Sequence, residues 1–205
     1  MNKGAESRLA VEGYLERLLE LGLMTCSVES AMSKLDLETG NMSPAQEFNW
    51  CSQRLSKLCD ENTWGDHFGP GRAREIMMAN FLGHKVALKT SGADAYENGD
   101  EPVEYKSTMQ NNISATYNGI SVQETWEKQV EYLNNEKICK YKNHYYARFN
   151  GGKIVGMYKM GCDKVIEYLL PRLKRQFDKE KKGKDPRLGV TITKKYIINN
   201  SEKLL

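Results

Sequence analysis

Two acidic residues and one lysine that lie close together in the chain, Asp94, Glu104 and Lys106, are the side chains best suited to chemistry. Carboxylate oxygens are the ligands that a hard cation such as Mg²⁺ prefers, and this cation keeps several waters and accepts phosphate oxygens. A bound cation lowers the pKa of its water and polarises a phosphoryl oxygen, while a nearby lysine can orient the water or offset negative charge. These residue types indicate metal-assisted phosphodiester hydrolysis. The alternative is a solvated hairpin whose glutamate and lysine merely pair at the surface.

A predicted β-hairpin would bring these three side chains together. Residues 97–100 read Glu-Asn-Gly-Asp between two extendable runs, and Asn-Gly is a strong hairpin signal because both residues tolerate positive φ. Side chains alternate between the two faces of the returning strand, so Glu104 and Lys106 point one way and Tyr105 points the other. We therefore expect Asp94, on the first arm, to lie beside the face that carries Glu104 and Lys106.

The same residues resemble the motif of a known nuclease superfamily. The segments Gly92-Ala93-Asp94-Ala95 and Glu104-Tyr105-Lys106-Ser107 are similar to the PD-(D/E)xK motif in its type II restriction endonuclease form. Ala93 stands where the family usually has proline. The resemblance extends weakly to the C-terminus through the order and pattern of residues 141–160 and the last basic segment, whereas residues 1–60 match no family pattern.

This resemblance implies a Mg²⁺-dependent type II restriction endonuclease that hydrolyses phosphodiester bonds at a specific site in double-stranded DNA. It also implies an α/β fold with a restriction-endonuclease-like core, a mixed β-sheet flanked by helices. Asp94 and Glu104 would hold the metal, with the main-chain carbonyl of Tyr105, and Lys106 would position or activate the water. Two alternatives stay open: another nuclease with this core, such as a junction resolvase or repair endonuclease, and a non-catalytic DNA-binding module.

A further acid, Glu75, lies on a helix expected from Arg72 to Gly83. In the family that the motif resembles, a helical acid before the core sheet often completes the metal site, which makes Glu75 a candidate metal ligand. The alternative is that Glu75 is an intrahelical partner for Arg72 or Arg74.

The polar run 107–119 directly follows the motif strand and is rich in amides and hydroxyls. Asn and Gln side chains can bind adenine through two hydrogen bonds, and Ser and Thr contact several base edges. This run is therefore a candidate base-reading element, and the alternative is an edge strand with ordinary surface amides. Its candidate DNA-binding residues are Gln110, Asn111, Asn112, Ser114, Thr116 and Asn118.

Charge is distributed unevenly along the chain, although the net charge is only +3. Residues 1–105 carry 10 Lys and Arg against 17 Asp and Glu, whereas residues 106–205 carry 20 against 10. A basic half downstream of a metal-site motif is what a polyanion binder needs, because cations neutralise phosphates and release counterions. Some of these lysines are explained equally well as solvated helix faces.

Composition limits the class of protein. The 205 residues are enough for one domain with a helical appendage. The five cysteines are odd in number and show no CxxC spacing, which predicts a reducing, cytoplasmic location and argues against a structural zinc site. We expect no membrane association, because no apolar run approaches spanning length and the N-terminus is charged.

The N-terminal region is predicted to be helical and acidic. Amphipathic periodicity predicts helices over 5–24 and 26–38, and Ser43-Pro44 is typical of a third helix start. We therefore expect a helical region over 1–60 that serves as a dimer interface or a cap, followed by a catalytic and DNA-binding core over 61–205.

Assembly follows from the need to cut two strands with one motif per chain. A two-fold homodimer matches the dyad of a palindromic site and places one active site on each strand. The apolar stripe of residues 9–23 and the segment around Phe48 and Trp50 are the candidate contact surfaces. The alternative is a monomer that nicks.

The remaining elements are predicted from periodicity and turn signals. His144 is isolated in the sequence, and a structural role is favoured over a catalytic one. Pro171 is expected to kink its helix or to start a new segment. The expected elements are a strand over 85–89, a helix over 121–135 capped by Ser121 and Glu124, a hairpin of strands 145–149 and 153–159, a helix over 162–182 and a strand over 189–198.

Overall fold

The computed structural model describes residues 42–89, 92–179 and 187–205. The chain divides into two compact units, residues 1–57 and 58–205, and only residues 42–57 of the first are described. The helices expected over 5–24 and 26–38 lie outside the described residues, as do residues 180–182 at the expected end of a later helix.

Helix α3 (Pro44–Glu61) begins where the sequence predicts. The Ser43 hydroxyl accepts the Gln46 main-chain N–H at 3.4 Å, and the Gln46 side chain accepts the Ser43 N–H at 2.8 Å. This reciprocal pair is a capping box, and the proline after it takes the first helical position, where no N–H is needed.

The centre of the second unit is a mixed β-sheet, which agrees with the expected α/β class. A six-stranded sheet has the order β1-β2-β3-β5-β6-β8, and β4 and β7 form a separate two-stranded ribbon. Strand β5 runs parallel to β3, while the other paired neighbours are antiparallel. The strands are β1 (Lys85–Val86), β2 (Ala95–Glu97), β3 (Glu101–Thr108), β4 (Ala115–Ser121), β5 (Asn143–Asn150), β6 (Lys153–Gly161), β7 (Arg187–Ile192) and β8 (Glu202–Lys203).

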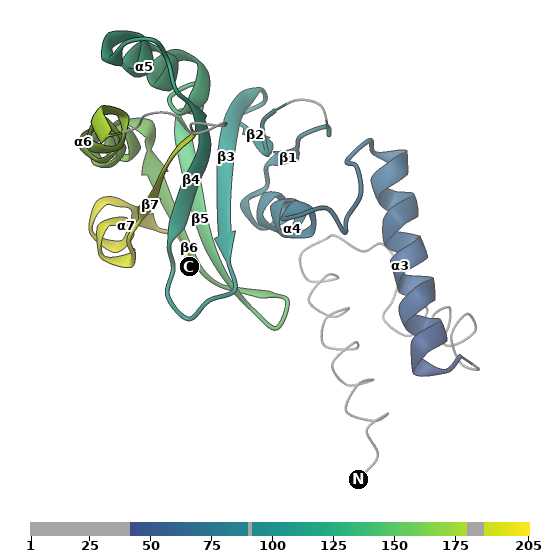
Figure 1. Ribbon diagram of the computed structural model, residues 1–205. Helices are drawn as coiled ribbons and strands as arrows, with labels where there is room; N and C mark the ends of the chain where they lie inside the picture. The colour runs from purple at the N-terminus through teal and green to yellow at the C-terminus, as the bar shows by residue number, and fades with distance from the viewer. Residues whose placement is uncertain (1–41, 90–91, 180–186) are drawn as a thin grey trace. The chain divides into compact units, whose positions relative to one another are not determined.

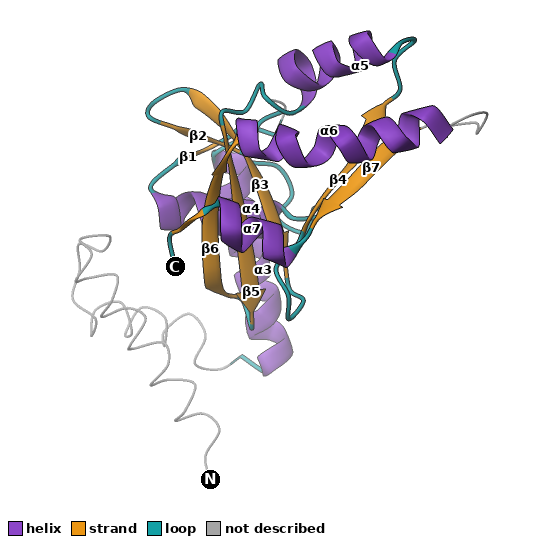
Figure 2. Ribbon diagram, turned by 90° about the vertical axis from the view of Figure 1, so that its left-hand side faces the viewer, coloured by secondary structure: helices purple, strands orange, loops and turns teal. Residues whose placement is uncertain are grey.

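Helices cover both faces of this sheet. Helix α4 lies on one face, and α5, α6, α7 and the β4–β7 ribbon lie on the other, as Figures 1 and 2 show. The helices are α4 (Arg72–Leu82), α5 (Trp126–Tyr132) continued by a π-helix η1 (Leu133–Lys137), α6 (Cys162–Lys179) and α7 (Lys194–Asn200). Helix α6 is continuous through Pro171, so this proline does not start a new segment.

Each face of the sheet has its own apolar core. On the α4 side, Met78 packs with Val103, Tyr105 and Phe149. On the α6 side the core joins both sheets to the helices, and its most buried large members include Ile120, Leu133, Tyr146, Leu169, Leu173, Ile192 and Ile197. The central strands are therefore held from both sides.

The hairpin that carries the motif is confirmed. Strands β2 and β3 pair in antiparallel register, with Ala95 opposite Val103 and Glu97 opposite Glu101. The turn residues Asn98 and Gly99 have φ of 48° and 96°, the left-handed conformation that these two residue types adopt most readily. The second expected hairpin is also present, as β5 and β6 across Gly151 and Gly152.

The prediction of a helix over 121–135 is wrong at its start. Ser121 ends strand β4, where it pairs with Arg187 of β7, so it cannot cap a helix. The helix begins at Trp126, and the Thr125 hydroxyl accepts the Lys128 N–H at 3.3 Å as its N-cap. Threonine and serine are both favoured at the N-cap. Pairing with β7 extends β4 over Ser121, so Thr125 takes this position.

Two predicted strands are shorter than expected. The strand expected over 189–198 ends at Ile192, and helix α7 follows. Helical turns bury Ile197 completely and set Tyr196 against Tyr168 with ring centroids 4.4 Å apart, so tertiary packing overrides the β-propensity of this run. Similarly, β1 ends at Val86, because the Lys89 N–H bonds the Thr63 carbonyl at 3.1 Å and the chain leaves the sheet.

No helix in the described ranges is long and apolar enough to cross a membrane.

Candidate active site

The hairpin register places Asp94 beside the middle of β3. The Asp94 N–H bonds the Val103 carbonyl at 3.2 Å, just before β2 begins at Ala95. The Asp94 carboxylate in turn accepts the Tyr105 N–H through Oδ2 at 2.6 Å. The backbone of β3 therefore fixes the orientation of this carboxylate, and Asp94 lines the cleft beside the strand.

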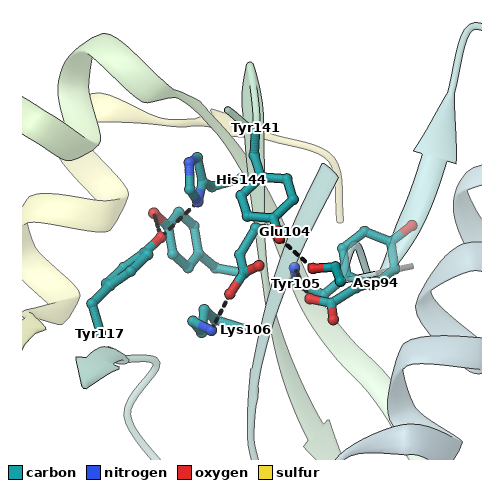
Figure 3. Close-up of polar contacts among 9 residues, drawn as sticks. Asp94, Glu104, Tyr105, Lys106, Tyr117, Tyr141 and His144 are labelled. Atoms are coloured by element: carbon teal, nitrogen blue, oxygen red, sulfur yellow. Dashed lines mark hydrogen bonds and ion pairs between the residues drawn. The ribbon is translucent and has the colours of Figure 1, made fainter. Parts of the chain in front are cut away.

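Glu104 and Lys106 lie on the same face of β3, as expected. Their side chains form an ion pair, and Figure 3 shows them pointing toward each other beside Asp94. The Glu104 side chain is 18% exposed and that of Lys106 is 27% exposed, so both reach solvent from the cleft. The Lys106 ammonium also lies 5.3 Å from the ring centroid of Tyr117 on β4, a cation–π distance. The three motif side chains therefore converge at one place.

Tyr105 points to the opposite face and anchors the strand. Its hydroxyl lies 2.8 Å from Nδ1 of His84, and its ring meets Tyr145 edge-on with centroids 5.8 Å apart. Next to it, the buried Glu97 accepts the Tyr145 hydroxyl at 2.5 Å. The Tyr105 N–H and hydroxyl take part in the hydrogen bonds given above. The role of its main-chain carbonyl in metal binding stays a prediction.

Burial and the neighbouring carboxylates together set the electrostatic character of the site. Burial raises the pKa of Asp94, the charges of Glu104 and Glu75 raise it further, and the result is a pKa of about 7. The Tyr105 N–H and the Lys106 charge act in the opposite direction but do not cancel this effect. Burial and two nearby acids disfavour the charged form of Asp94. A divalent cation bound here would stabilise that charged form.

Glu75 is near the cluster but is already paired. Its carboxylate forms an ion pair with Arg72 at 3.1 Å, which is the alternative that the sequence left open. Glu75 nevertheless lines a cleft of about 330 Å³ together with Asp94. It therefore contributes negative charge near Asp94 while its own pairing is with the helix residue.

The donor set fits a magnesium ion better than a metal that needs a full protein cage. In the described part of the chain, no group of three or more His, Cys, Asp or Glu side chains is arranged to hold a metal ion. Mg²⁺ does not need one, since it is usually bound by one or two carboxylates and keeps several waters. Asp94 and Glu104 supply that number, and hard oxygens are the correct donor type.

A second cleft of about 450 Å³ surrounds the motif side chains and is the place where a substrate can reach them. Asp94, Glu104 and Lys106 form part of its lining, and the other residues come from the segment before Asp94, from β4, and from η1 and the turn after it. These other lining residues are Gly92, Tyr117, Asn118, Ile120, Lys137, Ile138, Lys140 and Tyr141.

His144 has the structural role that the sequence favoured. It lies opposite Glu104 in the parallel β3–β5 register and is completely buried. Its Nδ1 is 2.9 Å from the Tyr117 hydroxyl, which is also 2.9 Å from the Tyr146 hydroxyl. Burial, and then the Lys106 charge, lower the pKa of His144 to about 3, so the imidazole stays neutral at physiological pH. This buried group supports Tyr117, which forms part of the cleft wall.

The candidate DNA-reading residues fall into two groups. On β4, Thr116 and Asn118 are exposed while Tyr117 between them is buried, and Asn118 lines the cleft with the motif side chains. Thr116 shares a 2.9 Å hydrogen bond with Thr191 of β7. The others, Gln110, Asn111, Asn112 and Ser114, lie in the connection between β3 and β4, where Asn112 accepts a hydrogen bond from Lys194 at 3.2 Å.

Lys137, Lys140 and Tyr141 are among the cleft residues that are absent from the sequence-based candidates. The Tyr141 hydroxyl donates to the Gly92 carbonyl and so connects the turn after η1 to the segment that carries Asp94. In the sequence these residues give only two lysines three positions apart and a tyrosine, which is a common pattern.

No protein-family model matches the chain, and no curated protein sequence matches it.

Proposed function

We propose that this protein is a Mg²⁺-dependent endonuclease that hydrolyses phosphodiester bonds in double-stranded DNA, of the type II restriction kind with a restriction-endonuclease-like core. The observation that carries the proposal is the convergence of Asp94, Glu104 and Lys106 on one face of β3, in a cleft open to solvent. The partial burial of all three side chains supports this proposal over a fully solvated hairpin surface.

Each side chain has a role that its surroundings favour. Asp94 and Glu104 provide oxygens for the cation, and the Tyr105 N–H fixes the orientation of the Asp94 carboxylate. When bound, Mg²⁺ would supply Lewis-acid polarisation of the phosphoryl oxygen and acidify a water. Lys106, positioned by Glu104 and by the Tyr117 ring, is placed to orient the attacking water or to offset charge on the phosphate.

The charge around the site supports a polyanionic substrate. The cleft combines two carboxylates with three lysines, and residues 106–205 carry twice as many basic as acidic side chains. Hydrolysis of a phosphodiester needs both kinds of side chain. The carboxylates would hold the metal cation, and the lysines would neutralise the negative charge of the phosphate. The exposed polar side chains of β4 next to the cleft are candidates for contacts with base edges.

Two other functions remain to be separated from this one by experiment. A junction resolvase or repair endonuclease would use the same three residues on a different DNA structure. A non-catalytic DNA-binding module would use the basic surface and leave the acids as hairpin charges. The burial and the nearby acids that raise the pKa of Asp94 favour a cation site over such a module.

The test is incubation of the purified protein with supercoiled plasmid DNA and Mg²⁺. Discrete linear fragments are expected, and they should disappear in Asp94→Asn and Glu104→Gln, because each variant loses one anionic ligand. Asp100→Asn is the matched control, since Asp100 lies in the turn of the same hairpin with its side chain 93% exposed. Full activity in Asp94→Asn or Glu104→Gln would contradict the site, and DNA binding without cleavage by the wild-type protein would favour the binding module.

A further inference from the structure

Two lysines of the cleft have no acidic partner among the residues that the structure describes. Of the three lysines that line it, Lys106 is ion-paired with Glu104. Lys137 and Lys140 form no ion pair with any carboxylate in the described part of the chain. Lys140 is exposed and Lys137 is half-buried, so each ammonium group is available to a ligand that enters the cleft.

A π-helix ends at Lys137, and Lys140 lies in the turn that follows it. The Ile138 N–H bonds the Leu133 carbonyl at 2.9 Å, five residues back, and this pattern widens the last turn of the helix that begins at Trp126. Ile138 and Leu133 are both buried in the core on the α6 side. Because Ile138 lies between the two lysines and is held in the core, they are presented on a fixed backbone.

Contacts of Tyr141 hold this turn next to the carboxylates. The Tyr141 hydroxyl bonds the Gly92 carbonyl, two residues before Asp94. The Lys140 ammonium lies 4.7 Å from the centroid of the Tyr141 ring, so the same ring both joins the two walls and restrains one cation. The spacing between the lysines and the acids is therefore set by the fold.

We propose that Lys137 and Lys140 bind the DNA backbone at a phosphate next to the one that is hydrolysed. This inference rests on the proposed function, which supplies the phosphodiester substrate. The two lysines act in positioning and do not touch the reacting atoms. The position of Lys137 and Lys140 across the cleft from Asp94 and Glu104 suits this role. The lysine wall would attract the DNA backbone, and the carboxylate wall would hold the metal ion.

Salt dependence distinguishes this role from a structural one. A lysine that contacts a phosphate releases a counterion, so its loss lowers the slope of log affinity against log salt by about 1 and weakens binding to all sequences alike. The double variant Lys137→Gln/Lys140→Gln should therefore lower the slope by about 2. The double variant Lys137→Arg/Lys140→Arg keeps both charges and should restore the slope.

The experiment measures anisotropy of a fluorescein-labelled DNA duplex of unselected sequence with the full-length protein in Ca²⁺, over a series of NaCl concentrations. The matched control is Lys85→Gln/Lys153→Gln, which removes the same charge from two exposed lysines outside the cleft lining. Far-UV circular dichroism of each variant accompanies the titrations. The control should keep the wild-type slope, and plasmid cleavage by each variant is measured in parallel with Mg²⁺.

The outcomes separate the two proposals. A slope lowered in the glutamine variant and restored in the arginine variant supports the phosphate contact, even if the wild-type protein does not cut DNA and the proposed function fails. An unchanged slope in a protein that cuts plasmid overturns the contact and leaves the proposed function standing. Equal loss of slope in the Lys85/Lys153 control would also overturn it, since the effect would then follow net charge alone.

Discussion

Replacing Asp94 with Asn should stabilise the folded protein at about pH 8 while it abolishes cleavage. Burial raises the pKa of the Asp94 carboxyl, the charges of Glu104 and Glu75 raise it further, and it reaches about 7 from an ordinary value of 3.8. An asparagine carries no charge that burial or the two acids can destabilise. Its amide oxygen can still accept the Tyr105 N–H that Asp94 Oδ2 accepts at 2.6 Å. The substitution therefore removes the unfavourable charge and keeps the hydrogen bond.

The magnitude follows from the pKa difference between the folded and unfolded chains. Each pH unit of difference is about 1.4 kcal/mol, so a pKa near 7 against 3.8 corresponds to at most about 4 kcal/mol at pH 8. Solvent screening and relaxation reduce this, and we expect about 2 kcal/mol. Between about pH 4 and pH 7 the folded state binds more protons than the unfolded state, so wild-type stability falls as pH rises through this range.

Urea unfolding at about pH 4.5 and about pH 8 in EDTA measures the effect. The gain in Asp94→Asn should be large at the higher pH and small at the lower one, and Asp100→Asn should show no such difference. Adding Mg²⁺ should stabilise the wild-type protein at pH 8 and narrow its gap to Asp94→Asn. The same gain at both pH values, or a loss of stability at pH 8, would refute the carboxylate-crowding argument.

Two further predictions concern catalysis and assembly. Lys106→Ala should lower the cleavage rate by at least ~10²-fold. The free energy of unfolding should change by no more than about 1 kcal/mol, because the ion pair of Lys106 with Glu104 is partly exposed. If a thermal melt shows that this variant is unfolded, its lower rate says nothing about catalysis. Sedimentation should give twice the 23.4 kDa chain mass, and loss of dimers on deleting residues 1–40 would place the interface there. A monomer that only nicks plasmid would exclude the dimer.

The sequence predicts the motif hairpin well because its determinants are local. Asn98 and Gly99 accept positive φ, and strand alternation alone places Glu104 and Lys106 on one face. The approach of Asp94 to this face also follows from the turn, since the hairpin register is fixed within a few residues. These features need no information from distant parts of the chain.

The features that sequence reasoning misses depend on distant packing. The pairing of β4 with β7 extends the strand over Ser121 and moves the N-cap to Thr125. The change from strand to helix after Ile192 depends on the contact of Tyr196 with Tyr168 on another helix. The positions of Lys137 and Lys140 in the cleft likewise depend on the π-helix, the turn after it and the buried Ile138.

The parallel pairing of β3 with β5 has a consequence for how this fold can diversify. Parallel neighbours cannot be joined by a tight turn, so a long crossover must connect them, and here residues 109–142 fill it. The exposed face of β4, the π-helix, Lys137 and Lys140 all belong to that one crossover, whereas the three motif residues lie before it. Exchange of the crossover, with its pairing to β7 preserved, would change the residues that contact the proposed substrate and leave Asp94, Glu104 and Lys106 in place. The arrangement is therefore modular and open to recombination and to protein engineering.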